Sequence, residues 1–292
     1  MSRTAVAGDA GIYAVIAALI RLRSAGPRDT YGRMDLHEKV AIVTGAARGV
    51  GAAIARRMAT AGARVILADI LDAEGDEVAR EMGEPAGFAH LDVTDESQWK
   101  ILVEGVVREH GRLDILVNNA AVLDIGRISS TSAATFRRVL DVNTTGPFLG
   151  TQAAYGPMAA QGKGAVINIG SIDGIFGTNG LSAYVTSKFG LRGLTKAAAL
   201  EFGRDGIRVN YIASGGGNPQ MYEPWIQEIL PFLEDTVAFQ NDRAIPGGAP
   251  PEAIAEAVVF LASDAAAHIT GAELPVDNGA TAGHFIAGFN RL

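Results

Sequence analysis

Tyr184 and Lys188 have the Tyr-x-x-x-Lys spacing of a pair that could carry out acid–base chemistry. At this spacing on a helix the two side chains share one face, so the phenol and the ammonium would be neighbours. A nearby ammonium favours the phenolate and would lower the tyrosine pKa from its usual value of about 10 toward neutrality, where acid–base catalysis works best. Ser171 lies upstream, and its hydroxyl could hydrogen-bond a substrate oxygen beside the phenol.

This spacing is a weak signal when it stands alone. A surface helix that carries Tyr184 and Lys188 by chance would give the same pattern. The catalytic interpretation therefore requires a cofactor site upstream in the chain.

Length and composition favour one large α/β domain and exclude several kinds of site. The chain has 292 residues, 48% hydrophobic residues and 36 glycines, which suits a buried core with many tight turns. The net charge is −7 and no run of Lys or Arg occurs, so we expect no nucleic-acid partner. There is no cysteine, and the five histidines lack metal-ligand spacing, so we expect neither disulfides nor a metal.

Residues 1–33 differ from the rest and are interpreted as an N-terminal extension before a domain at residues 34–292. The apolar run from Gly11 to Ile20 is too short to span a membrane. It could be a secretory signal, but no clean cleavage site follows. A helical extension that packs on the body or on a neighbouring subunit fits better, and an upstream start codon assigned in error would also explain it. We expect a cytoplasmic protein.

The segment that begins at Lys39 has the pattern of a βαβ unit with a glycine-rich turn. Apolar strands are predicted at Val40 to Val43 and at Arg64 to Ala68, with a helix from Gly51 to Ala61 between them. Gly45 would allow the sharp turn after the first strand. Gly49 and Gly51 would let the backbone approach a diphosphate and let the helix pack closely on the sheet. This arrangement predicts a dinucleotide site.

Asp69, at the end of the second strand, favours NAD over NADP. Its carboxylate could accept hydrogen bonds from the ribose hydroxyls and would repel a 2′-phosphate. Arg48 argues the other way, because a guanidinium in the glycine turn could pair with a phosphate. Ile70 supplies no second basic group, so NAD is preferred. Alternatively, Asp69 only caps the following helix.

Further strands would deliver polar residues to the same edge of the sheet. One ends near His90, so that Asp92 and the amide of Val93 could meet the adenine ring. The next runs from Leu113 to Ala121. Its last residues, Asn119, Ala120 and Ala121, are small enough for a cofactor to lie against the backbone.

Two more segments carry candidate catalytic residues. A long helix predicted from Ala133 to Tyr155 contains Asn143, with Gly146 and Pro147 just after it. This Asn is either a structural correction of a kink or a functional group, and its sequence context leaves both open. A strand from Ala165 to Ser171 would place Ser171 at the carboxyl edge, where open parallel sheets bind their ligands.

The segment at residues 218–245 is rich in Met, aromatic residues and Pro, and predicts an apolar lid over a substrate pocket. A helical hairpin that packs on a partner subunit is the alternative. A helix from Pro251 to Ala262 and a final strand then complete the sheet. Strands alternate with helices throughout, so we expect a doubly wound, Rossmann-like parallel sheet in a single domain with a helical lid.

Together these motifs resemble the short-chain dehydrogenase/reductase family with a TGxxxGxG turn and a YxxxK active site. The similarity runs from about Leu36 to Gly279 and has high combined specificity. It rests on TGAARGVG (44–51), Asp92, NNAA (118–121), Asn143, Ser171, Tyr184, Lys188 and GIRVN (206–210).

The resemblance implies specific roles for the candidate residues. Tyr184 would be the acid–base residue, and Ser171 would polarise the carbonyl. Lys188 would lower the tyrosine pKa and bind the nicotinamide ribose, and Asn143 would hold a water in a proton relay. Val50, in the glycine turn, and Gly215, after the sixth strand, would contact the cofactor. The resemblance also implies a homotetramer.

The chain departs from the family pattern after the sixth strand. Ser214 stands where the family usually has Pro, and no Thr follows to contact the nicotinamide carboxamide. We expect looser anchoring of the nicotinamide, or anchoring by Asn218, and a more mobile lid.

The leading hypothesis is NAD-dependent interconversion of a secondary alcohol and its ketone. The lid and residues such as Ile172, Phe176 and Leu181 suggest a hydrophobic, cyclic, aromatic or steroid-like substrate. A 3-oxoacyl thioester reductase of lipid synthesis that uses NADPH is the alternative, against which Asp69 and the acidic balance argue. A dinucleotide-binding scaffold or sensor with little turnover is a third reading.

Overall fold

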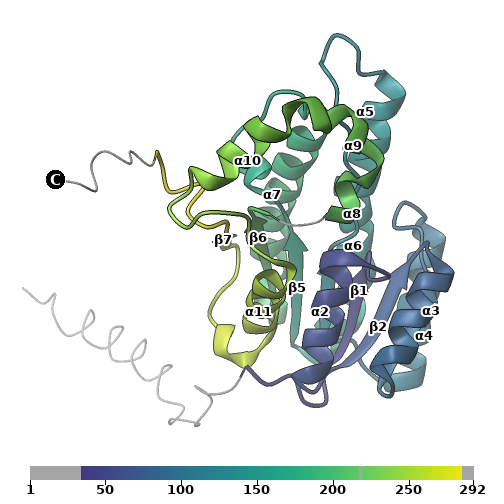
Figure 1. Ribbon diagram of the computed structural model, residues 1–292. Coiled ribbons are helices and arrows are strands. Elements are labelled where there is room, and N and C mark those ends of the chain that lie inside the picture. The colour runs from purple at the N-terminus through teal and green to yellow at the C-terminus, as the bar shows by residue number, and fades with distance from the viewer. Residues whose placement is uncertain (1–33, 217–218, 285–292) are drawn as a thin grey trace, which may run out of the picture.

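The computed structural model describes residues 34–216 and 219–284, so the predictions for residues 1–33 and for Asn218 lie outside it. Seven strands form one parallel sheet in the order β3-β2-β1-β4-β5-β6-β7 (Figure 1). The strands are β1 (Val40–Thr44), β2 (Arg64–Asp69), β3 (Ala86–His90), β4 (Ile115–Asn118), β5 (Gly164–Ile169), β6 (Ile207–Ser214) and β7 (Glu273–Val276).

Helices cover both faces of this sheet. The helices around it are α2 (Gly49–Thr60), α3 (Asp72–Met82), α4 (Glu96–His110), α5 (Ala133–Leu140), α6 (Gly146–Gln161), α7 (Ser182–Phe202) and α11 (Pro251–Ala262). One core cluster packs α2, α3 and α11 against the sheet, and a second packs α4, α6 and α7 against its other face. The predicted doubly wound parallel sheet in a single domain is confirmed.

The central strands are short apolar runs because both of their faces are covered. Every residue of β1, β4 and β5 is buried. Since β1 pairs with both β2 and β4, the strand order reverses between β1 and β4. In such sheets this reversal opens a crevice at the carboxyl ends of the strands, which is where ligands bind.

The helix predicted from Ala133 to Tyr155 is divided in the structure. It consists of α5, a π-helical turn (Asp141–Thr145) and α6, which continues to Gln161. Pro147 has no N–H and cannot donate the α-helical hydrogen bond to the carbonyl of Asn143, which favours an irregular turn at this place. The sequence showed a Gly/Pro disturbance but not the extra residue in the turn.

The described part of the lid consists of three short helices joined by 3₁₀ turns: α8 (Pro219–Tyr222), α9 (Ile226–Ile229) and α10 (Leu233–Asn241). Two of the turns have proline in their first positions, which explains the repeated interruptions. Figure 1 shows this green segment across the end of the sheet to which the arrowheads of the strands point. Within the described residues no helix is both long and apolar enough to cross a membrane.

Candidate active site

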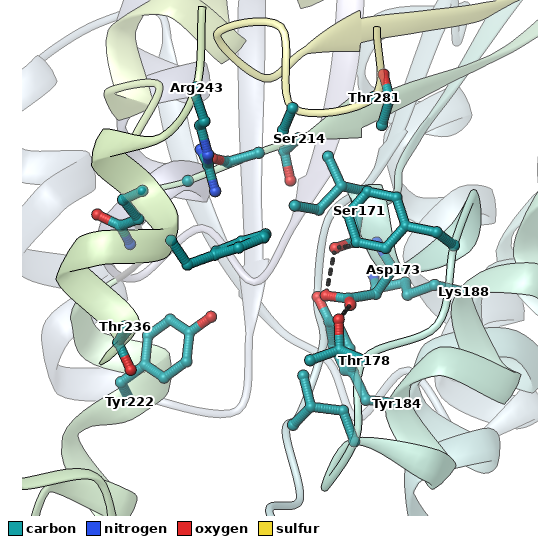
Figure 2. Close-up of a pocket in the computed structure, with 18 of the residues that line it drawn as sticks. Ser171, Asp173, Thr178, Tyr184, Lys188, Ser214, Tyr222, Thr236, Arg243 and Thr281 are labelled. Carbon is teal, nitrogen blue, oxygen red and sulfur yellow. Dashed lines mark hydrogen bonds between the residues drawn. The ribbon is translucent and has the colours of Figure 1, made fainter. Parts of the chain in front are cut away.

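A cleft with a volume of about 1590 Å³ lies at the carboxyl edge of the sheet, between α7 and the lid. Figure 2 shows Tyr222 and Thr236 on its lid side and Ser171, Asp173 and Tyr184 on the opposite side. Of the residues predicted to form the site, the cleft is lined by Val50, Asn119, Ala121, Ser171, Tyr184, Lys188 and Gly215.

Helix α7 carries both Tyr184 and Lys188 on its buried face. The side chain of Lys188 is only 2% exposed, and its Nζ donates a hydrogen bond of 2.9 Å to the carbonyl oxygen of Ile169 at the end of β5. The same Nζ lies 5.5 Å from the centroid of the Tyr184 ring. The two groups are therefore neighbours, as the spacing predicts, but the ammonium is held by the backbone rather than by the phenol.

The expectation of a lowered Tyr184 pKa is wrong for the protein as described. Burial raises the pKa of Tyr184 well above its usual value, and Tyr222 and Asp173 raise it further, whereas the Ser171 hydroxyl lowers it. Burial also lowers the pKa of Lys188 to about 8. Desolvation disfavours the charged form of each group, and at these positions it outweighs the attraction between phenolate and ammonium.

Ser171 follows β5 and begins a 3₁₀ turn (Ile172–Gly174). Its Oγ donates a hydrogen bond of 3.1 Å to Oδ2 of Asp173 and accepts one of 3.1 Å from the Asp173 N–H. The Thr178 hydroxyl donates a hydrogen bond of 2.6 Å to the other carboxylate oxygen of Asp173. The hydroxyl expected to face a substrate oxygen therefore already has an acceptor within the protein (Figure 2).

Asn143 lies in the π-helical turn and is completely buried. Its side-chain amide accepts a hydrogen bond from the Val122 N–H and donates to the Val122 carbonyl and to the Ser187 hydroxyl, all at 2.8–3.0 Å. The side chain thus fixes the chain after β4 to helix α7. Both readings of Asn143 are compatible with this position, because its main-chain carbonyl is a separate group.

The glycine turn after β1 fits a diphosphate. A Cβ on Gly45 would lie 2.8 Å from Cα of Ala120, and a Cβ on Gly51 would lie 2.0 Å from the Gly45 carbonyl oxygen, so the turn tolerates no side chain there. Gly45 and Gly49 also have positive φ angles of 63° and 56°. Within the described residues no side chain caps the N-terminus of α2, so its first N–H groups are left for an anion.

The charged residues beside this turn already have protein partners. The Asp69 carboxylate accepts hydrogen bonds from the N–H groups of Ala47, Ile70 and Leu71. It therefore organises the glycine turn as well as the start of the next helix. Arg48 lies 3.6 Å from Glu223 at the start of the lid.

The remaining cofactor candidates lie along the neighbouring strand ends. Asp92 accepts hydrogen bonds from the N–H and hydroxyl of Thr94. Val93 is buried, and its carbonyl accepts the indole N–H of Trp99. The side-chain amide of Asn119 donates to the carbonyls of Thr44 and Gly45, and the amide of Ala120 donates to the Thr44 hydroxyl.

The departure after β6 has a structural counterpart at Arg243. Its guanidinium is 6% exposed and donates to the carbonyls of Gly215 and Gly247. Ser214 does not fix the backbone as proline would, and its hydroxyl donates instead to the Gly170 carbonyl at 2.9 Å. Arg243 therefore connects the end of the lid to the chain after β6.

Sequence reasoning missed three residues that line the cleft: Asp173, Tyr222 and Arg243. Asp173 gave the clearest signal, since it stands two positions after Ser171 at the carboxyl edge of the sheet. Tyr222 and Arg243 belong to the lid, whose irregular sequence does not show which side chains point inward. Within the described part of the chain no group of three or more His, Asp and Glu side chains could hold a metal ion.

Comparisons with known proteins give a consistent picture. The profile of a family described as enoyl-(acyl carrier protein) reductase matches residues 45–281. A 3-alpha-(or 20-beta)-hydroxysteroid dehydrogenase of Mycobacterium tuberculosis is 45% identical over 84% of this chain and 90% of its own length. A trans-4-hydroxycyclohexanecarboxylate dehydrogenase of Sinomonas cyclohexanicum is 38% identical over 85% of this chain and 94% of its own.

A crystal structure of a gluconate 5-dehydrogenase from Burkholderia cenocepacia, in complex with NADP and tartrate, has a similar fold. It is 27% identical and covers 88% of this chain and 100% of its own, with a TM-score of 0.81. The family to which these proteins point uses NAD or NADP. The chain belongs to the short-chain dehydrogenase/reductase family and is an oxidoreductase that acts on CH–OH groups.

Proposed function

We propose that this protein is an NAD-dependent dehydrogenase that interconverts an apolar, cyclic or steroid-like secondary alcohol and its ketone. The observation that carries the proposal is the cleft, in which Ser171, Tyr184 and Lys188 form one wall and an apolar lid forms the other. Such a cavity can enclose a bulky apolar alcohol and leave its hydroxyl beside the phenol.

Tyr184 takes the proton of the alcohol hydroxyl in this mechanism and returns it in the reverse direction. Burial alone holds the phenol in its neutral form, so a cation beside it is required for the phenolate. When bound, an oxidised nicotinamide accepts the hydride and brings a positive charge next to the phenol. Lys188 supplies a second cation below its pKa of about 8.

Asn143 serves the proton relay through its backbone in this proposal. Its side chain is occupied by Val122 and Ser187, so the group left for a water is its main-chain carbonyl. Pro147, four residues later, offers that carbonyl no N–H.

The NAD preference is supported by Asp69, which lies beside the glycine turn at the end of β2 and would repel a 2′-phosphate. The basic residue that could attract such a phosphate, Arg48, lies instead against the lid carboxylate Glu223. Because the related gluconate 5-dehydrogenase was crystallised with NADP, the cofactor choice depends on this chain's own residues.

An apolar substrate is supported by the wall that the lid contributes. Its large side chains are partly or largely exposed to the cleft, as expected of a surface that a ligand covers. They are Met221, Tyr222, Ile226, Ile229, Phe232, Leu233 and Phe239. The names of the two relatives, a hydroxysteroid dehydrogenase and a hydroxycyclohexanecarboxylate dehydrogenase, fit the same class.

Reduction of an acyl thioester with NADPH is a second candidate function. The description of the matching family, enoyl-(acyl carrier protein) reductase, favours it. Asp69 and the net charge of −7 argue against it, because an NADPH site and an acidic carrier protein both favour basic residues.

We also propose a homotetramer that uses the exposed faces of α6 and α7. Large apolar side chains remain exposed there, including Phe148 and Tyr155 on α6 and Phe189 and Leu200 on α7. Multi-angle light scattering should give four times the chain mass of 30.4 kDa. Leu200→Glu should reduce that mass, whereas a monomeric wild type would refute the assembly.

The function is tested by following absorbance at 340 nm with NAD and with NADP over a panel of secondary alcohols, from short aliphatic to cyclic, aromatic and steroidal. Turnover of bulky apolar alcohols with NAD is expected. A preference for NADP and for acyl thioesters would favour the second candidate. Cofactor binding without turnover on the whole panel would indicate a scaffold.

A further inference from the structure

Asp173 is a charged residue that stands directly behind the catalytic hydroxyl. It is 9% exposed, lies in the turn after Ser171 and lines the cleft. Its two oxygens each accept a hydrogen bond, from the Ser171 and Thr178 hydroxyls. A carboxyl group that accepts at both oxygens, with no acceptor for a proton of its own in these contacts, behaves as a carboxylate.

The contacts of Ser171 determine which hydrogen bonds it can still make. A serine hydroxyl has one proton to donate and two lone pairs that accept. The proton is directed to Asp173, and one lone pair receives the Asp173 N–H. One lone pair remains for the cleft, so Ser171 can accept a hydrogen bond from a ligand but has no proton to offer it.

We propose that Asp173 is a positioning residue that holds the Ser171 hydroxyl as a hydrogen-bond acceptor, so that the site binds the alcohol in preference to the ketone. This inference rests on the proposed function. An alcohol can donate its proton to Ser171 while its oxygen accepts from the Tyr184 phenol. A ketone has no proton to donate, so it gains a bond from Ser171 only when that hydroxyl leaves Asp173.

The bond that must break for the ketone is charge-assisted and therefore stronger than an ordinary one. Thr178 holds the second carboxylate oxygen at 2.6 Å and prevents the carboxylate from following the serine. The preference for the alcohol is thus part of the protein and favours oxidation as the working direction.

The variant that tests the proposal is Asp173→Asn, which keeps the shape of the side chain but removes its charge. Its amide can donate to Ser171 Oγ and release the serine proton toward the cleft. We expect the KM of the ketone to fall about threefold to tenfold while the KM of the alcohol changes less. Because the overall equilibrium fixes the ratio of the two kcat/KM values, the kcat ratio must change to compensate.

A second readout follows from the position of the charge. The groups that act on Tyr184 are Asp173 in the 3₁₀ turn, Tyr222 on α8, Tyr211 on β6 and Lys188 on the same helix. Removing the negative charge at 173 lowers the Tyr184 pKa. Oxidation needs the unprotonated phenol, so the rise of its rate with pH should begin at a lower pH in Asp173→Asn.

Thr178→Val is the matched control, because it removes a donor from the same carboxylate but leaves the charge and the Ser171 bond. It should keep the wild-type ratio of the two KM values and the wild-type pH profile. The proposal is overturned if Asp173→Asn changes neither, or if Thr178→Val changes both to the same extent. The latter result would show that only the packing of the turn matters.

An absorbance titration of the tyrosines at 295 nm, with Tyr184→Phe as the reference, separates this proposal from the function. It is done on the protein without substrate, so it reads the Tyr184 pKa whether or not any alcohol is turned over. Absence of turnover by the wild type would refute the proposed function. An unchanged Tyr184 titration in Asp173→Asn would refute the action of Asp173 on the phenol.

Discussion

The two halves of the carboxyl edge are built in different ways. Around the glycine turn, surfaces are made of backbone and small residues, and the carboxylates of Asp69 and Asp92 are satisfied mainly by main-chain N–H groups. Around α7, buried ionisable side chains such as Lys188 and Asp173 lie next to a broad apolar lid. The first half selects by shape, whereas the second depends on electrostatic interactions between side chains from different elements.

The largest effect is expected in the second half, from Tyr184→Phe. The change removes the acid–base group but keeps the ring and its packing, so kcat should fall by about 10²- to 10⁴-fold. The dissociation constant of NAD, measured by fluorescence titration, should change little, because the glycine turn is untouched. A variant that keeps most of its activity would rule out Tyr184 as the acid–base residue.

Gly51→Ala should cause the largest effect in the first half, and it should act through shape. The new Cβ would lie 2.0 Å from the Gly45 carbonyl oxygen, so the turn has to move. We expect a loss of about 1–3 kcal/mol in the free energy of unfolding and at least tenfold weaker NAD binding. Thermal unfolding and fluorescence titration measure the two quantities.

Gly156→Ala on α6 is the control for that change. Its Cβ would meet nothing within 4 Å among the described residues, and alanine favours a helix by about 1 kcal/mol over glycine. Equal destabilisation by both variants would show that close approach at Gly51 is not the cause.

The same difference explains what could be predicted from the sequence. The sheet and the glycine turn leave local patterns, because buried strands are apolar runs and close backbone approach requires glycine at Gly45 and Gly51. The spacing of Tyr184 and Lys188 likewise shows on one helix. These features need no knowledge of distant contacts.

The electrostatic behaviour of the site could not be predicted in that way. The direction of the Tyr184 pKa depends on burial beneath elements that are far apart in the sequence, including Tyr222 of the lid. The Ser171 hydroxyl was assigned to the substrate because its contact with Asp173 depends on the local turn. The π-helical turn at Asn143 required knowing how α6 packs, beyond the presence of Pro147.

Asp69→Ala tests whether the first half also selects its cofactor by charge. It removes the repulsion of a 2′-phosphate and the hydrogen bonds to the ribose, each of which is worth about 1.5–3 kcal/mol when the acceptor is charged. The ratio of kcat/KM for NAD to that for NADP should fall about 10- to 100-fold. Asp72→Ala, three residues later on an exposed carboxylate that pairs with His90, should leave the ratio unchanged.

Glu223→Gln should give the smallest effect and tests the printed ion pair between the two halves. Glu223 of the lid lies 3.6 Å from Arg48 of the glycine turn, and both side chains are at least half exposed. Exposed pairs contribute less than about 1 kcal/mol and weaken as salt is added. The dissociation constant of NAD should therefore change less than about threefold at physiological salt, with a somewhat larger change at low salt. A tenfold change that persists in high salt would contradict the separation of the halves, because the lid would then determine how the glycine turn holds the cofactor.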